Sequence, residues 1–205
     1  MNKHQTKRVF IALDNMSATK ARDIIEKYKD EVYGFKVNHL LMHELAPYGD
    51  LNIFLDLKLW DIPNTVTSIV QHAIELEASY ITISTLNSPK VFEQLQQFNR
   101  DIFLLGVTSL TSWTQQEEYN IHHKPTYHIW DSHISKIVDN FSGIICPVPD
   151  LPIIDKVDTE HKLTRICPGI RPTSTKDDQA RIATPKDAIN AGADYLVMGR
   201  SFLNA

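Results

Sequence analysis

The segment at residues 52–65 (NIFLDLKLWDIPNT) places two opposite charges inside the residue pattern of a β-strand. Alternate residues of a strand share a face, so Asp56 and Lys58 are expected on one face and the aliphatic side chains on the other. If the aliphatic face packs against helices, the charged pair points into the interior, where unpaired ions cost several kcal/mol each. The pattern therefore predicts a paired carboxylate and ammonium, which form either a structural ion pair or part of a catalytic site.

Two other apolar runs end in charged residues in the same way. Asp14 ends the first apolar run, and Lys36 lies near the end of the second. In a barrel of parallel strands, the carboxyl ends of the strands form one mouth, where catalytic residues collect. All four charged residues are therefore expected at this mouth, where alternating charges can keep a lysine protonated and stabilise charge that forms on a substrate.

Two motifs late in the sequence combine glycine with arginine and form a candidate anion site. The motifs CPGIRP and VMGR contribute Pro168, Arg171, Gly199 and Arg200. Each motif follows a predicted strand, and the loops after the seventh and eighth strands of a barrel commonly bind phosphate. A phosphorylated substrate is expected, although either motif alone also fits a glycine turn with a solvated arginine.

The strands and helices that position these residues can be predicted from the sequence. Short apolar runs alternate with helical patterns along the chain, which is typical of repeated strand–helix units. The eight expected strands lie near residues 9–14, 33–37, 52–59, 79–84, 102–108, 143–147, 164–168 and 194–198. This repetition favours the α/β class and a (β/α)8 TIM barrel over an open doubly wound sheet. The open sheet is disfavoured because ALDN at residues 12–15 stands where a glycine-rich dinucleotide motif would follow the first strand.

Residues that begin or end helices mark three of the intervening segments. Ser17 is expected to cap the helix after the first strand, and Pro63 to lie in the first turn of the helix after the third strand. Thr184 precedes a proline at the start of the last predicted helix, which Gly192 ends. The polar stretch at residues 171–181 has no such signals and is expected to be a mobile surface loop.

The composition is that of an ordinary globular protein. The 205 residues include 21 Lys and Arg against 25 Asp and Glu, which gives a net charge of -4. There is neither a basic stripe suited to nucleic acid nor an apolar run suited to export or to a membrane span. With only Cys146 and Cys167, a disulfide framework is not expected, so we predict one domain over residues 1–205 in the cytoplasm. Five residues follow Arg200, so the final helix of the barrel is expected to be missing.

The sequence resembles the bacterial form of the orotidine 5'-phosphate decarboxylase family. The matching segments occur in order along nearly the whole chain: residues 12–14 (ALD), 35–37 (FKV), 54–65 (FLDLKLWDIPNT), 107–112 (VTSLTS), 168–172 (PGIRP) and 192–200 (GADYLVMGR). The resemblance implies a cofactor-free and metal-free enzyme that converts orotidine 5'-monophosphate to uridine 5'-monophosphate in de novo pyrimidine synthesis. It also implies a homodimer with shared active sites.

The resemblance further implies roles for the charged residues. Lys58 would deliver a proton to C6 of the pyrimidine, and Asp56 would lie beside the departing carboxylate. Lys36 would hold these two residues in line and contact the ribose, whose hydroxyls Asp14 would bind. Asp61 would complete the array from the neighbouring subunit.

Further implied roles concern substrate binding. Thr65 would reach across the dimer toward the ribose, and Thr111 would bind the pyrimidine. The phosphate would be held by Arg171, Gln179 and Arg200 with the backbone of Gly199, in a site that includes the segment beginning at Pro168. Since Gln179 lies in the polar loop, that loop would act as a lid that closes over the phosphate and expels water.

Two alternatives remain at this point. One is a metal-dependent decarboxylase of the same suprafamily that acts on a keto-sugar phosphate, although Lys36 would oppose a cation near the second strand. The other is a phosphate-binding barrel without catalysis. Residues 83–87 (ISTLN) also replace the Val-His-Ala stretch that the family usually has at the end of the fourth strand.

Overall fold

The architecture was determined from a computed structural model of the chain. It describes residues 1–108, 110, 112–123, 126–172 and 182–204, without the side chains of residues 115, 122 and 126–132. Parallel strands pair in chain order from β1 to β8, and β8 pairs with β1, so the sheet closes into a barrel. The strands are β1 (Val9–Ala12), β2 (Gly34–Val37), β3 (Ile53–Leu59), β4 (Tyr80–Ser84), β5 (Phe103–Val107), β6 (Gly143–Ile145), β7 (Thr164–Cys167) and β8 (Tyr195–Met198).

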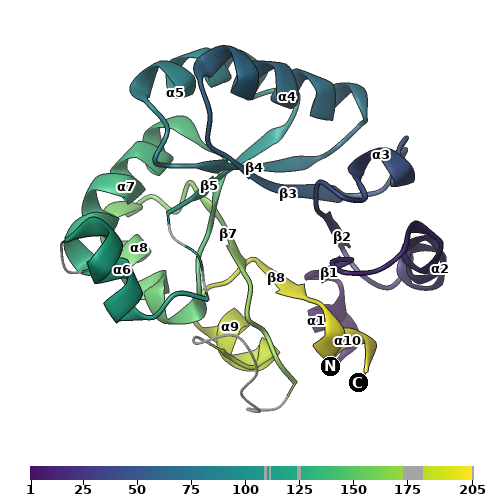
Figure 1. Ribbon diagram of the computed structural model, residues 1–205. Helices are drawn as coiled ribbons and strands as arrows, with labels where there is room; N and C mark the ends of the chain where they lie inside the picture. The colour runs from purple at the N-terminus through teal and green to yellow at the C-terminus, as the bar shows by residue number, and fades with distance from the viewer. Residues whose placement is uncertain (109, 111, 124–125, 173–181, 205) are drawn as a thin grey trace.

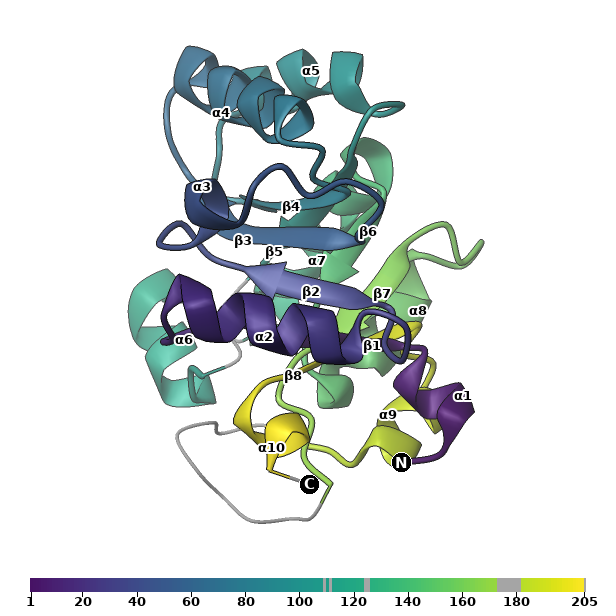
Figure 2. The same ribbon diagram turned by 90° about the vertical axis from the view of Figure 1, so that its right-hand side faces the viewer.

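Helices surround the barrel on its outer side (Figure 1). The α-helices are α1 (Lys3–Thr6), α2 (Ala18–Tyr28), α3 (Met42–Leu45), α4 (Pro63–Glu75), α5 (Pro89–Leu95), α6 (Gln115–His122), α7 (Thr126–Asn140), α8 (Leu151–Val157), α9 (Pro185–Asn190) and α10 (Arg200–Leu203). Two short 3-10 helices, η1 (Gln96–Phe98) and η2 (Val148–Asp150), complete the connections. Seen from the side, α2 lies along the outside of the barrel next to β1 and β2 (Figure 2).

The predicted (β/α)8 barrel is confirmed, and the closed sheet excludes the open doubly wound alternative. Each expected strand is present within two residues of its predicted bounds. The side chain of Ser17 accepts a hydrogen bond from the Lys20 N–H at the start of α2, and Thr184 accepts one from the Asp187 N–H at the start of α9. Where the final helix was expected to be missing, a single helical turn, α10, follows β8.

The hydrophobic core has an outer and an inner layer. Outward-facing residues of the strands, such as Ile53 and Leu55, are fully buried against the helices. Inside the barrel, the ring of Phe10 makes edge contacts with those of Tyr33, Phe54, Tyr80 and Tyr195 at centroid distances of 5.1 to 5.7 Å. These aromatic rings fill the interior, and Phe54 precedes Asp56 on the inward face of β3, as the alternation predicts.

In the part of the chain that the structure describes, no helix combines the length and the apolar character that a membrane crossing requires.

Candidate active site

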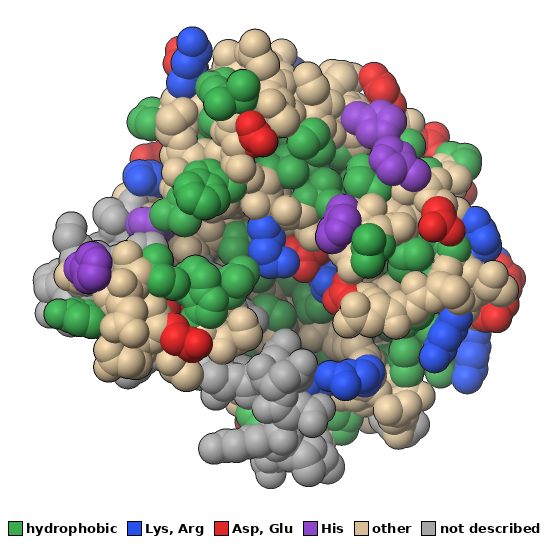
Figure 3. Space-filling model, viewed as in Figure 1, with side chains coloured by type: hydrophobic (Ala, Val, Ile, Leu, Met, Phe, Trp, Pro, Cys, Tyr) green, Lys and Arg blue, Asp and Glu red, His purple; other side chains and the backbone are tan. Residues whose placement is uncertain are grey.

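Four charged side chains form a continuous row at the carboxyl ends of β1, β2 and β3. Lys36 Nζ lies 2.7 Å from Asp14 Oδ2 and 3.0 Å from Asp56 Oδ2. Lys58 Nζ lies 2.6 Å from Asp56 Oδ1, so the charges alternate from Asp14 to Lys58. In the space-filling view, basic and acidic groups alternate in the hollow at the centre of this face (Figure 3). The structure therefore brings together the four charges that were predicted from three separate strands.

Burial and the neighbouring charges together determine the pKa values of the two interior residues of this row, Lys36 and Asp56. Only 9% of the Lys36 side chain is exposed, against 40% for Lys58. Burial acts to lower the pKa of Lys36, but the carboxylates of Asp56 and Asp14 outweigh it and hold this pKa above its ordinary value. Burial acts to raise the pKa of Asp56, but the ammonium groups of Lys36 and Lys58 hold it below its ordinary value. At neutral pH the interior members of the row are thus charged.

The backbone of β3 is irregular where it carries Asp56 and Lys58. Leu55 pairs with Ile81 of β4, but the next pair joins Leu59 to Ile83, so the register shifts between the two. Within this interval Lys58 has a φ of 47°, which is in the left-handed region. A residue other than glycine held in that region costs about 1–3 kcal/mol and marks a segment whose conformation the surroundings impose. The irregularity therefore directs the two charged side chains of β3, as β-bulges near active sites do.

Side chains of β4 and of the turn after it hold this irregular segment. The buried hydroxyl of Thr82 accepts a hydrogen bond from the Lys58 N–H at 2.8 Å and lies 3.2 Å from Asp56 Oδ1. The amide of Asn87 donates to the Leu59 carbonyl at 2.7 Å. Neither residue was among those predicted from the sequence. A signal was present in the polar position of Thr82 within the apolar run of β4.

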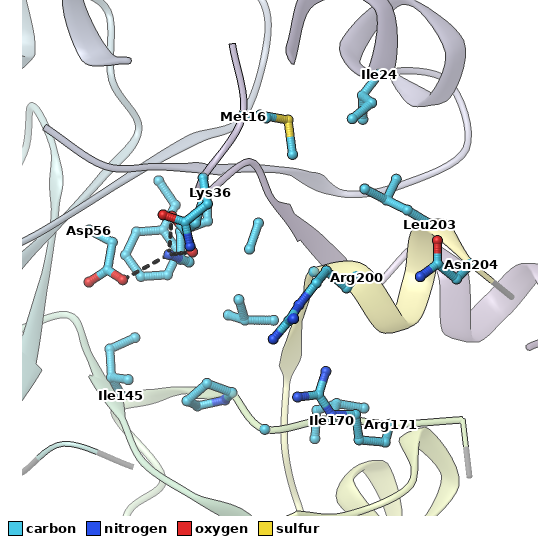
Figure 4. Close-up of a pocket in the computed structure, with 18 of the residues that line it drawn as sticks. Met16, Ile24, Lys36, Asp56, Ile145, Ile170, Arg171, Arg200, Leu203 and Asn204 are labelled. Atoms are coloured by element: carbon cyan, nitrogen blue, oxygen red, sulfur yellow. Dashed lines mark hydrogen bonds and ion pairs between the residues drawn. The ribbon is translucent and has the colours of Figure 1, made fainter. Parts of the chain in front are cut away.

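A cavity of about 1300 Å³ opens at this end of the barrel. Asp14, Lys36, Asp56 and Lys58 line one side of it, and Pro168, Gly169, Arg171, Gly199 and Arg200 line another. Figure 4 shows Lys36 and Asp56 on one side of the cavity, with Arg171 and Arg200 on the other. The cavity thus joins a row of alternating charges to a pair of arginines next to glycine backbone, which suits an anionic group.

The loop that carries Arg171 is tied to the rest of the barrel. The Arg171 N–H donates to the Ala183 carbonyl at 2.9 Å, and the Ala183 N–H donates to the Gly169 carbonyl at 3.2 Å. The hydroxyl of Ser201 in α10 donates to the Ile170 carbonyl at 3.0 Å. These contacts join the segments after β7 and β8, so that both arginines belong to one wall of the cavity.

The remaining predicted site residues lie elsewhere. Neither Asp61 nor Thr65 is among the described residues that line the cavity. Asp61 is exposed, its carboxylate accepts the N–H of Ile62 at 2.7 Å, and Thr65 is half-buried on α4. Thr111 and Gln179 lie outside the described residues, as does most of the loop predicted to act as a lid.

The arrangement suits a reaction in which negative charge forms on a substrate carbon near Lys58. A protonated, partly exposed lysine at the end of the row can deliver a proton into the cavity. Lys36 and Lys58 keep the Asp56 carboxylate ionised, so Asp56 would repel a second anionic group placed beside it. The arginine wall would bind a remote anionic group and fix the orientation of the substrate.

Comparison with known proteins identifies the family. The sequence matches the family described as "Orotidine 5'-phosphate decarboxylase / HUMPS family" over residues 7–205. The chain belongs to this family. Among its relatives, orotidine 5'-phosphate decarboxylase of Carboxydothermus hydrogenoformans is 33% identical over 98% of this chain and 90% of the relative. The enzyme of the same name from Legionella pneumophila (strain Lens) is 31% identical over 98% of this chain and 93% of its own.

Two solved structures of orotidine 5'-phosphate decarboxylases have the same fold. The structure of orotidine 5'-phosphate decarboxylase from Lactobacillus acidophilus superposes with a TM-score of 0.80 at 24% identity, over 97% of this chain and 92% of the other. The one from Pyrococcus horikoshii OT3 gives a TM-score of 0.73 at 24% identity, with coverage of 96% and 91%. The resemblance recognised in the sequence motifs is thereby confirmed at the level of the family and of the fold.

Proposed function

We propose that this protein is an orotidine 5'-phosphate decarboxylase, a carboxy-lyase that converts orotidine 5'-monophosphate to uridine 5'-monophosphate and carbon dioxide in pyrimidine biosynthesis. The observation that carries this proposal is the row from Asp14 to Lys58, which faces the arginine wall across one cavity. Membership of the family and the names of the relatives support the same reaction. In this proposal the reacting groups are side chains of the chain itself, without a cofactor.

In the proposed reaction, the bond between C6 of the pyrimidine and its carboxylate breaks, and the carboxylate leaves as carbon dioxide. The electron pair of that bond remains on C6, and the ammonium of Lys58 supplies the proton that replaces the carboxylate. Asp56 lies next to this ammonium and would face the departing carboxylate of the substrate. Repulsion between the two carboxylates favours conversion of the substrate carboxylate to neutral carbon dioxide. The fixed charges of the row need no reorganisation as carbanion character develops.

Binding of the rest of the substrate follows from the two walls of the cavity. Arg171, Arg200 and the backbone of Gly199 would hold the phosphate, and Pro168 begins the loop that contributes Arg171. Lys36 and Asp14 would contact the ribose. We also assign pyrimidine binding to Thr111 and a further phosphate contact to Gln179. Binding energy from the phosphate would then support the chemistry at C6.

We further propose a homodimer in which Asp61 and Thr65 complete the site of the partner subunit. The large apolar side chains on either side of Asp61 in the chain support this, since Trp60 is 69% exposed and Ile62 66%. An exposed apolar surface of this kind is typical of a protein interface. Since Asp61 contributes nothing to the lining of its own cavity among the described residues, a role across the interface accounts for its exposed position. We place the protein in the cytoplasm, which the free thiols of Cys146 and Cys167 support.

The experiment that tests the function follows the ultraviolet absorbance change as orotidine 5'-monophosphate is consumed, with a chelator present. We expect turnover by the wild type and a loss of at least about 100-fold in Lys58→Ala, because the general acid is removed. Lys90→Ala is the matched control, since Lys90 is an exposed lysine on α5 outside the cavity.

The result has three informative outcomes. Near-normal turnover by Lys58→Ala would remove Lys58 from the mechanism. Turnover that requires added magnesium would favour a metal-dependent decarboxylase of a keto-sugar phosphate. Tight binding of uridine 5'-monophosphate without any turnover of the substrate would identify a phosphate-binding barrel that lacks catalysis.

A further inference from the structure

Thr82 on β4 contacts both charged residues of the irregular β3 segment through one oxygen atom. Its side chain is fully buried, and Oγ1 lies 2.8 Å from the Lys58 nitrogen, 3.2 Å from Asp56 Oδ1 and 3.4 Å from the Leu55 carbonyl oxygen. The hydroxyl accepts the Lys58 N–H, so its single proton is available for donation. The nearer acceptor is the Asp56 carboxylate, which favours that hydrogen bond over the one to Leu55.

Asn87, in the turn after β4, holds the other end of the same segment. Its Nδ2 donates to the Leu59 carbonyl at 2.7 Å and to the Ser84 carbonyl at 2.9 Å. Its Oδ1 accepts the Asp61 N–H at 3.2 Å. The side chain is buried and thus connects the backbone on both sides of Trp60 to β4.

These contacts replace the regular strand pairing that β3 loses. Between Leu55 and Leu59 the register with β4 shifts, and Lys58 takes a left-handed φ that the chain alone disfavours. A segment in such a conformation requires partners that determine it. The partners are two side chains of β4 and the turn after it: Thr82 binds the backbone N–H of Lys58, and Asn87 binds the backbone carbonyl of Leu59.

We propose that Thr82 and Asn87 are positioning residues for the decarboxylation, which fix the β3 segment so that the Lys58 ammonium and the Asp56 carboxylate keep their places in the row. This inference rests on the proposed function. Neither residue contacts the substrate in this proposal, since neither lines the cavity among the described residues. Thr82 and Asn87 act through Asp56 and Lys58, which do line the cavity, because they hold the irregular part of β3 that carries these two residues.

The test compares Thr82→Val, which removes the hydroxyl at nearly constant volume, with Thr82→Ser, which keeps it. We expect kcat of Thr82→Val to fall by about 10- to 100-fold, since a small displacement of a reacting group has effects of that size. KM and the affinity for uridine 5'-monophosphate should stay within about threefold, because the arginine wall is untouched. Thr82→Ser should restore most of the lost kcat. Asn87→Leu, which removes three hydrogen bonds, should also lower kcat more than it raises KM.

Thr85→Val is the matched control for a purely structural role. Thr85 is a fully buried threonine directly after β4 whose hydroxyl contacts the Val107 carbonyl and His133 instead of β3. Its replacement should lower the melting temperature and leave kcat unchanged. In Thr82→Val the acid limb of the pH profile of kcat should move to higher pH, because Asp56 loses a hydrogen bond that favours its charged form. The control should show no such movement.

The outcomes separate this inference from the function on which it rests. A wild-type protein that fails to turn over orotidine 5'-monophosphate overturns both. An active wild type together with a folded Thr82→Val of normal kcat and pH profile overturns only the positioning role. If Thr82→Ser, which keeps the hydroxyl, is as impaired as Thr82→Val, the hydroxyl does not account for the loss of kcat, and the role assigned to it is wrong. A folded Asn87→Leu of normal kcat removes Asn87 from the proposal.

Discussion

Lys58 and Asp56, two residues apart on β3, form an ion pair with 2.6 Å between Nζ and Oδ1. The second oxygen of the same carboxylate, Oδ2, lies 3.0 Å from Lys36 Nζ. Each oxygen of Asp56 therefore holds one ammonium group, and neither lysine competes with the other for the same acceptor. This division fixes the orientation of the carboxylate and makes Asp56 the centre of the charge row.

Replacement of Lys36 tests how far the row depends on its buried cation. In Lys36→Met, Asp14 and Asp56 lose the ammonium between them, so we expect kcat to fall by about 100-fold or more as the field at C6 changes. The free energy of unfolding should also decrease by about 1–3 kcal/mol, because the largely buried carboxylate of Asp56 loses one of its partners. Chemical denaturation and steady-state kinetics measure the two effects.

The control for this variant is Lys29→Met. Lys29 forms a pair of 2.9 Å with Glu26 on the surface of the molecule, and solvent-exposed pairs contribute little to stability. It should therefore change neither stability nor kcat appreciably. Equal losses in both variants would contradict the special contribution of the buried cation.

The lowered pKa of Asp56 predicts how stability depends on pH. The ionised form is favoured in the folded state, so its stabilising contribution is present above the ordinary carboxyl pKa of about 4 and is lost as the pH falls through the lower folded value. The difference in unfolding free energy between the wild type and Asp56→Asn should be constant from pH 7 to about pH 5 and change below about pH 4. Urea denaturation at several pH values measures it, and a difference that is independent of pH would refute the assignment.

The tyrosines at the amino-terminal end of the barrel predict a loss of stability at alkaline pH. Burial raises the pKa of Tyr33 to about 12, and its hydroxyl lies 2.6 Å from that of Tyr80. Since the neutral form is favoured in the folded protein, this contribution is complete below the ordinary pKa of about 10 and is lost between about pH 10 and the folded value.

Phenolate absorbance and unfolding, followed together, measure this effect. Tyr33→Phe should reduce the loss of stability above about pH 10, whereas Tyr119→Phe, at an exposed position, should leave it unchanged. Ionisation of the buried tyrosines without any change in stability would contradict the prediction.

Mixing of two inactive variants tests the proposed sharing of sites across a dimer. Lys58→Ala and Asp61→Asn would each inactivate both sites of their own homodimer. In a mixed dimer, one site would receive wild-type residues from both chains, so random exchange should restore roughly a quarter of the sites. Recovery of activity on mixing, absent from either variant alone, is the expected result. If Asp61 serves its own chain, mixing restores nothing.

The sequence was sufficient to predict the eight strands and the charge row, because both depend on local patterns. The alternation around Asp56 and the position of Asp14 and Lys36 at strand ends need no knowledge of pairing between strands. The roles of Thr82 and Asn87 depend instead on which residues of β3 and β4 face each other. A register shift and a left-handed φ at Lys58 have no marker in the sequence, since such positions favour glycine.

The pairing of β1 with β8 that closes the barrel has a consequence for the synthesis of the protein. Val9 of β1 pairs with Leu196 of β8, so one edge of the growing sheet lacks its neighbour until the last strand has left the ribosome. At about 5–20 residues per second, that delay lasts on the order of 10–40 seconds. During this time the edge of β1 that β8 later covers is open to pairing with other chains, so aggregation of the nascent polypeptide competes with closure of the barrel.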